Sequence, residues 1–217
     1  MGKRILCFGD SNTWGAIPLS EGRYPADVRW TGVLQRALGE GWTVVEEGHG
    51  GRTSVWDDPV EGKPSGLSYL MPCLDSQAPL DLVVLMLGTN DTKERFGCGA
   101  EMIAMGMRRL IAAVGHMNNE LLPPPPVLLI SPIHMSEAYR DALLGWFGNG
   151  CVEKTKAFAK AYQSVAAQCG CFFMDAALAA APSPRDGCHM EPDAHKALGM
   201  AVYEKIMTIF PTDFTAL

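Results

Sequence analysis

Five short apolar runs, separated by longer segments of helical periodicity, constrain the fold of this chain more than any other feature. Such runs, rich in Val, Ile, Leu and Phe, are typical of parallel strands buried on both faces. They span residues 4–8, 42–46, 82–87, 127–130 and 171–174, and the helical segments span 30–38, 66–76, 100–117, 151–168 and 194–209. The alternation predicts right-handed crossovers and an α/β fold, a three-layer α/β/α sandwich around a five-stranded parallel sheet.

A chain of 217 residues is long enough for one substantial core. We therefore expect a single domain over residues 1–217. Residues 47–64 and 131–150 show no clean periodicity. Long loops of this kind in a compact α/β domain usually form lids or pocket walls.

Composition limits the partners. The net charge of −6, without a basic cluster, predicts no nucleic-acid binding. The first apolar run is too short for a signal peptide and no run could span a bilayer, so we expect a cytoplasmic protein without membrane contact. Seven cysteines without a CxxC pair, and histidines without a ligand spacing, predict free thiols, no metal and no cofactor. The modest net charge therefore favours a neutral or weakly polar small molecule as the substrate.

The residues that follow the predicted strands are the candidates for chemistry, because ligands bind beyond the carboxyl ends of parallel strands. The sequence after the first, second and third strands contains Gly-Asp-Ser-Asn, Glu-Gly-His-Gly-Gly-Arg-Thr and Gly-Thr-Asn-Asp, and Asp-Gly-Cys-His follows the fifth at a distance. Each motif alone is more often a turn or a helix cap. Their common position at one edge of the sheet makes coincidence the weaker explanation.

Together these residues supply the parts of an acyl-transfer enzyme. Ser11 is the candidate nucleophile, His189 its base, and Asp186 the carboxylate that fixes the histidine tautomer. The backbone N–H groups of Ser11 and Gly51 and the side-chain amide of Asn90 are the candidate oxyanion donors.

These blocks resemble, in order and spacing, the four blocks of the SGNH (GDSL-type) hydrolase superfamily, and the resemblance spans nearly the whole chain. The segments CFGDSNTWG, DVRWTGVLQ, EEGHGGRT and LMLGTNDTK are most similar to the arylesterase/acyltransferase branch. The resemblance implies a flavodoxin-like SGNH hydrolase fold, a homo-oligomer, and the same catalytic and oxyanion residues. Asn12 stands where many members carry leucine, and Gly50 beside Gly51 leaves the donor glycine open by one residue.

Further residues are assigned by their position. Asp10, Trp14 and Ile17 adjoin the nucleophile and are assigned to the substrate pocket, Asp10 also to hydrogen bonds within the turn. Aromatic residues in the long loops are expected either to narrow the pocket or to lie in the core or an interface: Trp56, Trp146 and Phe147. His195 is expected at the surface or at a helix start.

The sequence thus predicts a serine esterase that hydrolyses short-chain or aryl carboxylic esters through an acyl-enzyme, with water or an alcohol as acceptor. One alternative is a carbohydrate acetylesterase with the same triad. Another is a flavodoxin-like binding module whose serine turn holds an anion. The module gives no reason for Asn90, Asp186 and His189 to share the edge.

Overall fold

The computed structural model describes residues 2–116 and 123–211, and in them one sheet of five parallel strands has the order β2-β1-β3-β4-β5. The strands are β1 (Lys3–Gly9), β2 (Trp42–Gly48), β3 (Leu82–Met86), β4 (Val127–Ser131) and β5 (Phe172–Asp175). Each apolar run predicted to be a strand therefore forms one. The predicted α/β fold with a five-stranded parallel sheet is confirmed.

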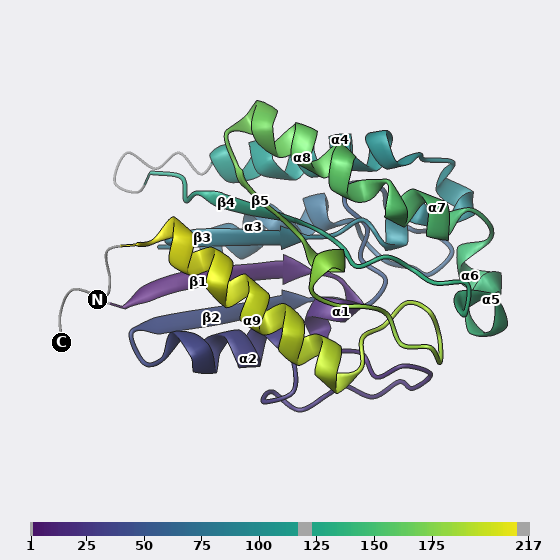
Figure 1. The fold of residues 1–217 in the computed structure, drawn as a ribbon. Coiled ribbons are helices and arrows are strands. Elements are labelled where there is room, and N and C mark those ends of the chain that lie inside the picture. Colours follow the sequence, from purple (N-terminus) through teal and green to yellow (C-terminus); the bar gives the residue numbers. More distant parts are fainter. Residues whose placement is uncertain (1, 117–122, 212–217) are drawn as a thin grey trace.

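Helices cover both faces of the sheet (Figure 1). The longer ones are α2 (Trp30–Leu38), α3 (Gly66–Gln77), α4 (Ala100–Gly115), α8 (Phe158–Cys169) and α9 (Pro192–Ile209). The alternating side chains of β1 explain the three layers, since successive residues of a strand point to opposite faces. Ile5 and Cys7 pack under α2 and α9, whereas Leu6 and Phe8 pack under α3, α4 and α8.

The helical prediction differs from the structure in the second half of the chain. Residues 151–168 form two helices, α7 (Cys151–Lys156) and α8, that meet at Ala157. The segment 131–150 contains two single-turn helices, α5 (Tyr139–Ala142) and α6 (Leu144–Phe147). Periodicity does not detect such short helices because one turn contains too few residues to repeat. The predicted end of α4 at Met117 lies outside the described residues, and the helix itself ends at Gly115.

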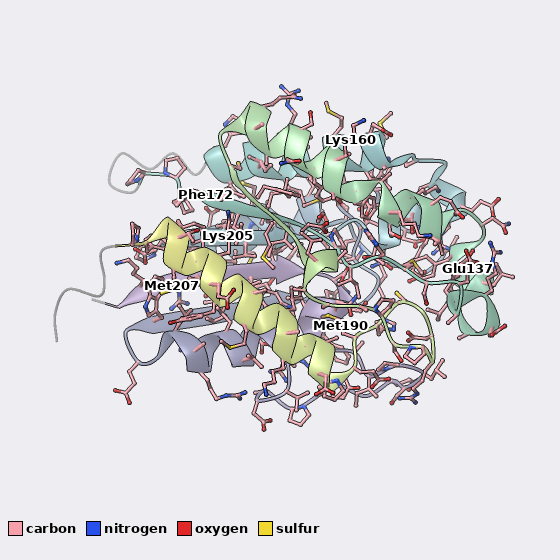
Figure 2. All side chains as sticks on the ribbon, in the orientation of Figure 1. Glu137, Lys160, Phe172, Met190, Lys205 and Met207 are labelled. Carbon is pink, nitrogen blue, oxygen red and sulfur yellow. The ribbon has the colours of Figure 1, made fainter. Side chains whose placement is uncertain are left out.

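Side chains follow the same inside–outside division (Figure 2). Glu137 and Lys160 are exposed, whereas Met190, just before α9, is fully buried. The seven cysteines are free, and five of them are buried. Within the described ranges, no helix is both long and apolar enough to cross a membrane.

The carboxyl ends of all five strands point to one side of the molecule, where α1 (Ser11–Trp14), which begins at the candidate nucleophile, and the short helices α5 and α6 lie (Figure 1). Gly88 follows β3 on this side, with a φ of +128° that disfavours residues with a side chain. A Cβ atom on Gly88 would lie 2.1 Å from the hydroxyl of Tyr162. That hydroxyl donates a hydrogen bond to the carbonyl of Leu87 (2.7 Å), so it cannot move without breaking the bond.

Replacing Gly88 by alanine should therefore lower the free energy of unfolding by about 2–4 kcal/mol, from backbone strain together with the clash. Urea denaturation measures the change. Gly97→Ala is the matched control, because Gly97 also has a positive φ (+63°) but nothing within 4 Å of the added carbon. The control should lose only about 1 kcal/mol. Equal losses in the two variants would contradict the packing argument.

Candidate active site

Ser11 lies at the carboxyl end of β1, as the first residue of α1. The Asp10 carboxylate caps this turn by accepting a hydrogen bond from the backbone N–H of Asn12 (3.0 Å). The turn packs against the end of β2 so closely that a Cβ atom on Gly48 would lie 2.1 Å from the nitrogen of Trp14. Glycine at that position lets the second strand end directly beneath the nucleophile turn.

His189 contacts both Ser11 and Asp186, which is the geometry of a general base held by an orienting carboxylate. His189 Nε2 lies 3.1 Å from Ser11 Oγ, and Nδ1 lies 2.7 Å from Asp186 Oδ2. Asp186 is 1% exposed and also accepts hydrogen bonds from the backbone N–H groups of Cys188 and His189, both at 3.0 Å. Burial acts to raise the pKa of Asp186, but the hydrogen bond and charge of His189 and the two N–H groups outweigh it and lower that pKa.

The candidate oxyanion donors face the same space as the nucleophile. Ser11, Gly50, Gly51, Asn90 and His189 all line one cavity of about 530 Å³. Asn90 donates one amide hydrogen to the carbonyl of Arg52 (3.1 Å), which fixes the orientation of the amide. Both glycines line the cavity, so the assignment of the donor to Gly51 stays a prediction.

Arg52, which was not assigned a role from the sequence, fixes the segment that carries these glycines. It is 5% exposed, and its Nη1 donates to the carbonyl of Gly9 (2.9 Å) and to that of Glu47. Its guanidinium lies 4.2 Å from the ring centre of Phe8, a cation–π contact. The arginine therefore joins the ends of β1 and β2 beneath the glycines.

Two carboxylates are buried behind the site. Asp91 accepts hydrogen bonds from both the backbone N–H (2.9 Å) and the hydroxyl of Ser54. Burial raises the pKa of Asp91 and of Asp10 to about 6 each. Hydrogen bonds from Ser54, and for Asp10 from Asn12, oppose this rise.

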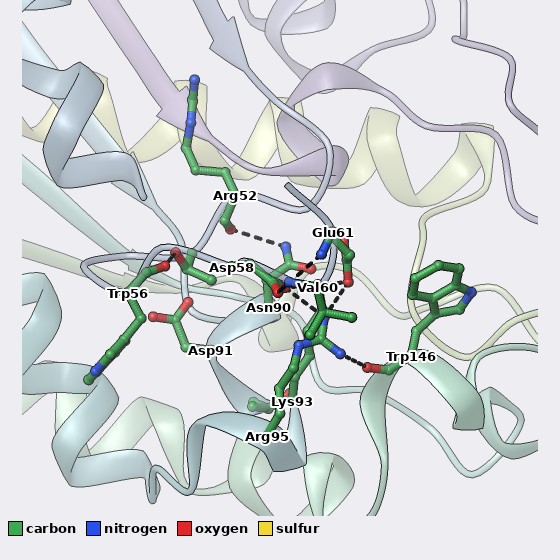
Figure 3. Close-up of polar contacts among 12 residues, drawn as sticks. Arg52, Trp56, Asp58, Val60, Glu61, Asn90, Asp91, Lys93, Arg95 and Trp146 are labelled. Carbon is green, nitrogen blue, oxygen red and sulfur yellow. Dashed lines mark hydrogen bonds and ion pairs between the residues drawn. The ribbon is translucent and has the colours of Figure 1, made fainter. Parts of the chain in front are cut away.

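Four charged side chains, Asp58, Glu61, Lys93 and Arg95, form a cluster beside the cavity (Figure 3), and Glu61 and Lys93 line it. Lys93 Nζ pairs with Asp58 (3.4 Å) and with Glu61, and Arg95 pairs with the same two carboxylates, at 2.6 Å for Asp58. Arg95 also donates to the carbonyl of Trp146 (2.7 Å). The cluster thus joins the loop before α3 to the segment after β3 and to α6.

The pocket assignments made from the sequence agree with the cavity only in part. Trp14 lines it, but Asp10 and Ile17 are not among its lining residues. Asp10 is 2% exposed, with its carboxylate turned to the backbone of α1, and Ala16 lines the cavity where Ile17 was expected.

The prediction for the aromatic residues of the long loops also agrees with the cavity only in part. Trp146 and Phe147 line the cavity, whereas Trp56 packs against the core beside Phe96. The other lining residues were not predicted: Ser20, Val60, Glu61, Lys63, Lys93, Leu143 and Cys188. Of these, only Lys93 and Cys188 lie within the motifs that the sequence comparison used.

His195 is buried rather than on the surface, near the start of α9. Its Nδ1 accepts a hydrogen bond from the backbone N–H of Trp30 (3.3 Å). Burial, together with the charge of Arg29, lowers its pKa to about 4. The histidine therefore stays neutral and joins α9 to α2. In the part of the chain that the structure describes, no three His, Cys, Asp or Glu side chains form a group that could hold a metal.

A serine, histidine and aspartate in hydrogen-bond contact, beside an amide and a glycine segment at the end of a parallel sheet, define a serine hydrolase site. The chain belongs to the GDSL-like lipase/acylhydrolase family, whose model matches residues 7–197. The resemblance to SGNH hydrolases seen in the sequence is thereby confirmed. No curated protein matches the chain significantly.

Several solved structures are similar over almost the whole chain. An aryl esterase from M. smegmatis is 39% identical, with a TM-score of 0.89, and the match covers 95% of this chain and 99% of that one. A carbohydrate acetylesterase from Sinorhizobium meliloti is 37% identical, with a TM-score of 0.90 and coverage of 96% and 100%. A putative arylesterase from Agrobacterium tumefaciens is 36% identical, with a TM-score of 0.87 and coverage of 95% and 99%.

The raised pKa of Asp91 predicts a measurable effect of pH on stability. Between its ordinary value of 3.8 and about 6, the folded protein keeps a proton that the unfolded chain has released. The contribution of Asp91 to the free energy of unfolding should therefore fall as the pH rises through this window, and Asp91→Asn should remove that fall. In urea titrations at pH 4 and pH 7, the stability of the variant relative to the wild type should rise by on the order of 1–3 kcal/mol. A pH-independent difference would contradict the shift.

Proposed function

We propose that this protein is a serine esterase that hydrolyses short-chain and aryl carboxylic esters through an acyl-enzyme. The observation that carries the proposal is the linked set of contacts from Asp186 through His189 to Ser11. Membership of the GDSL-like family supports ester hydrolysis, and the similar aryl esterase supports the substrate class.

The geometry suggests each step. Ser11 Oγ attacks the ester carbonyl carbon while its proton passes to His189 Nε2, 3.1 Å away. Asp186 keeps the other ring nitrogen protonated and stabilises the imidazolium that forms. The backbone N–H groups of Ser11 and Gly51 and the amide of Asn90 stabilise the oxyanion. The tetrahedral intermediate then collapses, and the leaving alcohol takes the proton from His189.

The second half of the reaction repeats the first with water. His189 removes a proton from a water molecule, the hydroxide adds to the acyl carbon, and the collapse returns the proton to Ser11 as the carboxylic acid is released. An alcohol in place of water would give a new ester. The cavity of about 530 Å³ leaves space for such an acceptor beside a short acyl group.

Replacing Ser11 by alanine should lower kcat for p-nitrophenyl acetate by a factor on the order of 10⁴ or more, because no nucleophile is left. A fluorophosphonate probe should add one label to the wild type and none to the variant, as measured by intact-protein mass. Ser20→Ala is the matched control. Ser20 lines the same cavity, but its hydroxyl accepts a hydrogen bond from the backbone N–H of Gly22. Equal, feeble rates for the wild type and Ser11→Ala would favour the binding module.

A carbohydrate acetylesterase is the second candidate, and the polar part of the cavity wall favours it. Trp146 is 54% exposed, as a stacking platform for a sugar would be, and Ser20, Glu61 and Lys63 add polar groups to the wall. The similar carbohydrate acetylesterase points the same way. The apolar part of the wall, formed by Leu143, Phe147 and Val60, favours aryl and short acyl groups instead.

Acetate release from p-nitrophenyl acetate and from acetylated xylose, measured on one preparation, separates the two candidates. We expect kcat/KM to be higher for the aryl ester, and to fall as the acyl chain lengthens from acetate to octanoate, because the cavity is of limited volume. A higher kcat/KM for the acetylated sugar would make the carbohydrate acetylesterase the better assignment.

Three expectations stay predictions: the cytoplasmic location, the use of alcohols as acceptors, and the homo-oligomer. The last is supported by large apolar side chains exposed near the cavity, among them Val60 (66%) and Trp146 (54%).

A further inference from the structure

Asn12, the residue after the nucleophile, contacts the backbone on both sides of the catalytic histidine. Its Nδ2 donates to the carbonyl of Cys188 (3.1 Å), and its Oδ1 accepts from the N–H of Met190 (3.1 Å). Asn12 is 3% exposed, and Cys188 and Met190 are buried as well. One side chain of the nucleophile turn therefore holds both neighbours of His189.

The contacts of Asn12 join the segment of His189 to the segment of Ser11, whereas the contact of Asp186 with His189 does not. Asp186 orients the imidazole ring, but it lies three residues from His189 in the same loop (residues 186–191, the histidine loop), so its contact does not join that loop to the turn of Ser11. The distance from this loop to Ser11 must be set by contacts that cross from one segment to the other. In the described part of the chain, three hydrogen bonds join residues 10–14 to residues 186–190, and Asn12 makes two of them. The third is the reacting contact between His189 and Ser11.

Other hydrogen bonds of the histidine loop connect it to different parts of the molecule. Gly187 accepts from the backbone N–H of Ser136 (2.9 Å), after β4. At the far end of the loop, Glu191 accepts from the hydroxyl of Tyr24 (3.1 Å). These contacts hold the loop against other segments, and Met190 also packs in the core beside β1. Apart from the reacting pair, the hydrogen bonds between the loop and the turn of Ser11 in the described residues are those of Asn12.

The amide group matches its two partners chemically. One end of an amide donates and the other accepts, as a carbonyl and an N–H require, and buried groups of this kind are costly when left unpaired. A leucine of similar size could make neither bond. An aspartate would keep the bond to Met190 but would direct a carboxylate oxygen at the carbonyl of Cys188.

We propose that Asn12 is a positioning residue that sets the distance between His189 Nε2 and Ser11 Oγ, an inference that rests on the proposed esterase function. Asp10 supports it from below, because its carboxylate caps the turn through the backbone N–H of Asn12. A displacement of the base by about 1 Å is enough to cost on the order of 100-fold in rate. Substrate binding in the cavity does not involve the amide, since Asn12 is not among the lining residues.

Asn12→Leu should therefore lower kcat for p-nitrophenyl acetate by roughly 10- to 100-fold and leave KM within about twofold. Asn12→Asp, which retains the shape, should also lose activity and guards against a leucine variant that does not fold. Circular dichroism melting establishes that each variant is folded at the assay temperature. The matched control is Tyr24→Phe, which removes a hydrogen bond from the same loop at Glu191, away from His189. It should keep kcat within about twofold of the wild type.

A double-mutant cycle separates positioning from general damage. If Asn12 acts through the base, then Asn12→Leu should not lower further the residual activity that remains in a His189→Ala background. A double variant clearly slower than His189→Ala, or a kcat of Asn12→Leu within twofold of the wild type, would overturn the proposal. Persistent activity in Ser11→Ala would instead overturn the proposed function, so the two failures are distinguishable.

Discussion

The contact between His189 Nε2 and Ser11 Oγ joins segments that are 178 residues apart in sequence. It depends on the order of the strands. The chain passes from β1 outward to β2 and then returns to β3 on the other side of β1, so the connections diverge between β1 and β3. A crevice opens at the carboxyl ends of strands at such a point. Ser11 follows β1 and Asn90 follows β3, which places nucleophile and amide on its two sides.

The residues of the site that follow strands directly could be predicted from the apolar runs, whereas Asp186 and His189, which follow β5 at a distance, were assigned from their spacing and the family resemblance. A buried parallel strand is recognisable from its apolar run, and its end fixes the position of the next few residues, as for Ser11 and Asn90. The walls of the cavity were not predictable in this way. They depend on contacts between Asp58, Lys93 and Arg95, from segments with no local pattern in common. Short helices such as α6 escape periodicity for the same reason that α1 does: each has a single turn.

The charged cluster beside the cavity needs its internal ion pairs to be stable. Asp58 is 1% exposed and Lys93 also 1%, and taking such charges out of water costs several kcal/mol per ion unless they are paired. The pairs with Glu61 and Arg95 balance two positive and two negative groups in one cluster. The cluster holds the loop before α3 against α6. Both segments line the cavity, so the ion pairs help to fix its shape.

Two different contacts then determine how the base meets the nucleophile. Asp186 controls the rotation and the tautomer of the imidazole from within the histidine loop. Asn12 controls how near that loop lies to Ser11, because its amide belongs to the same turn as Ser11 and makes hydrogen bonds to the backbone on either side of His189. The sequence alone assigned no role to Asn12, since the contacts of its amide depend on a loop that approaches only in the folded chain.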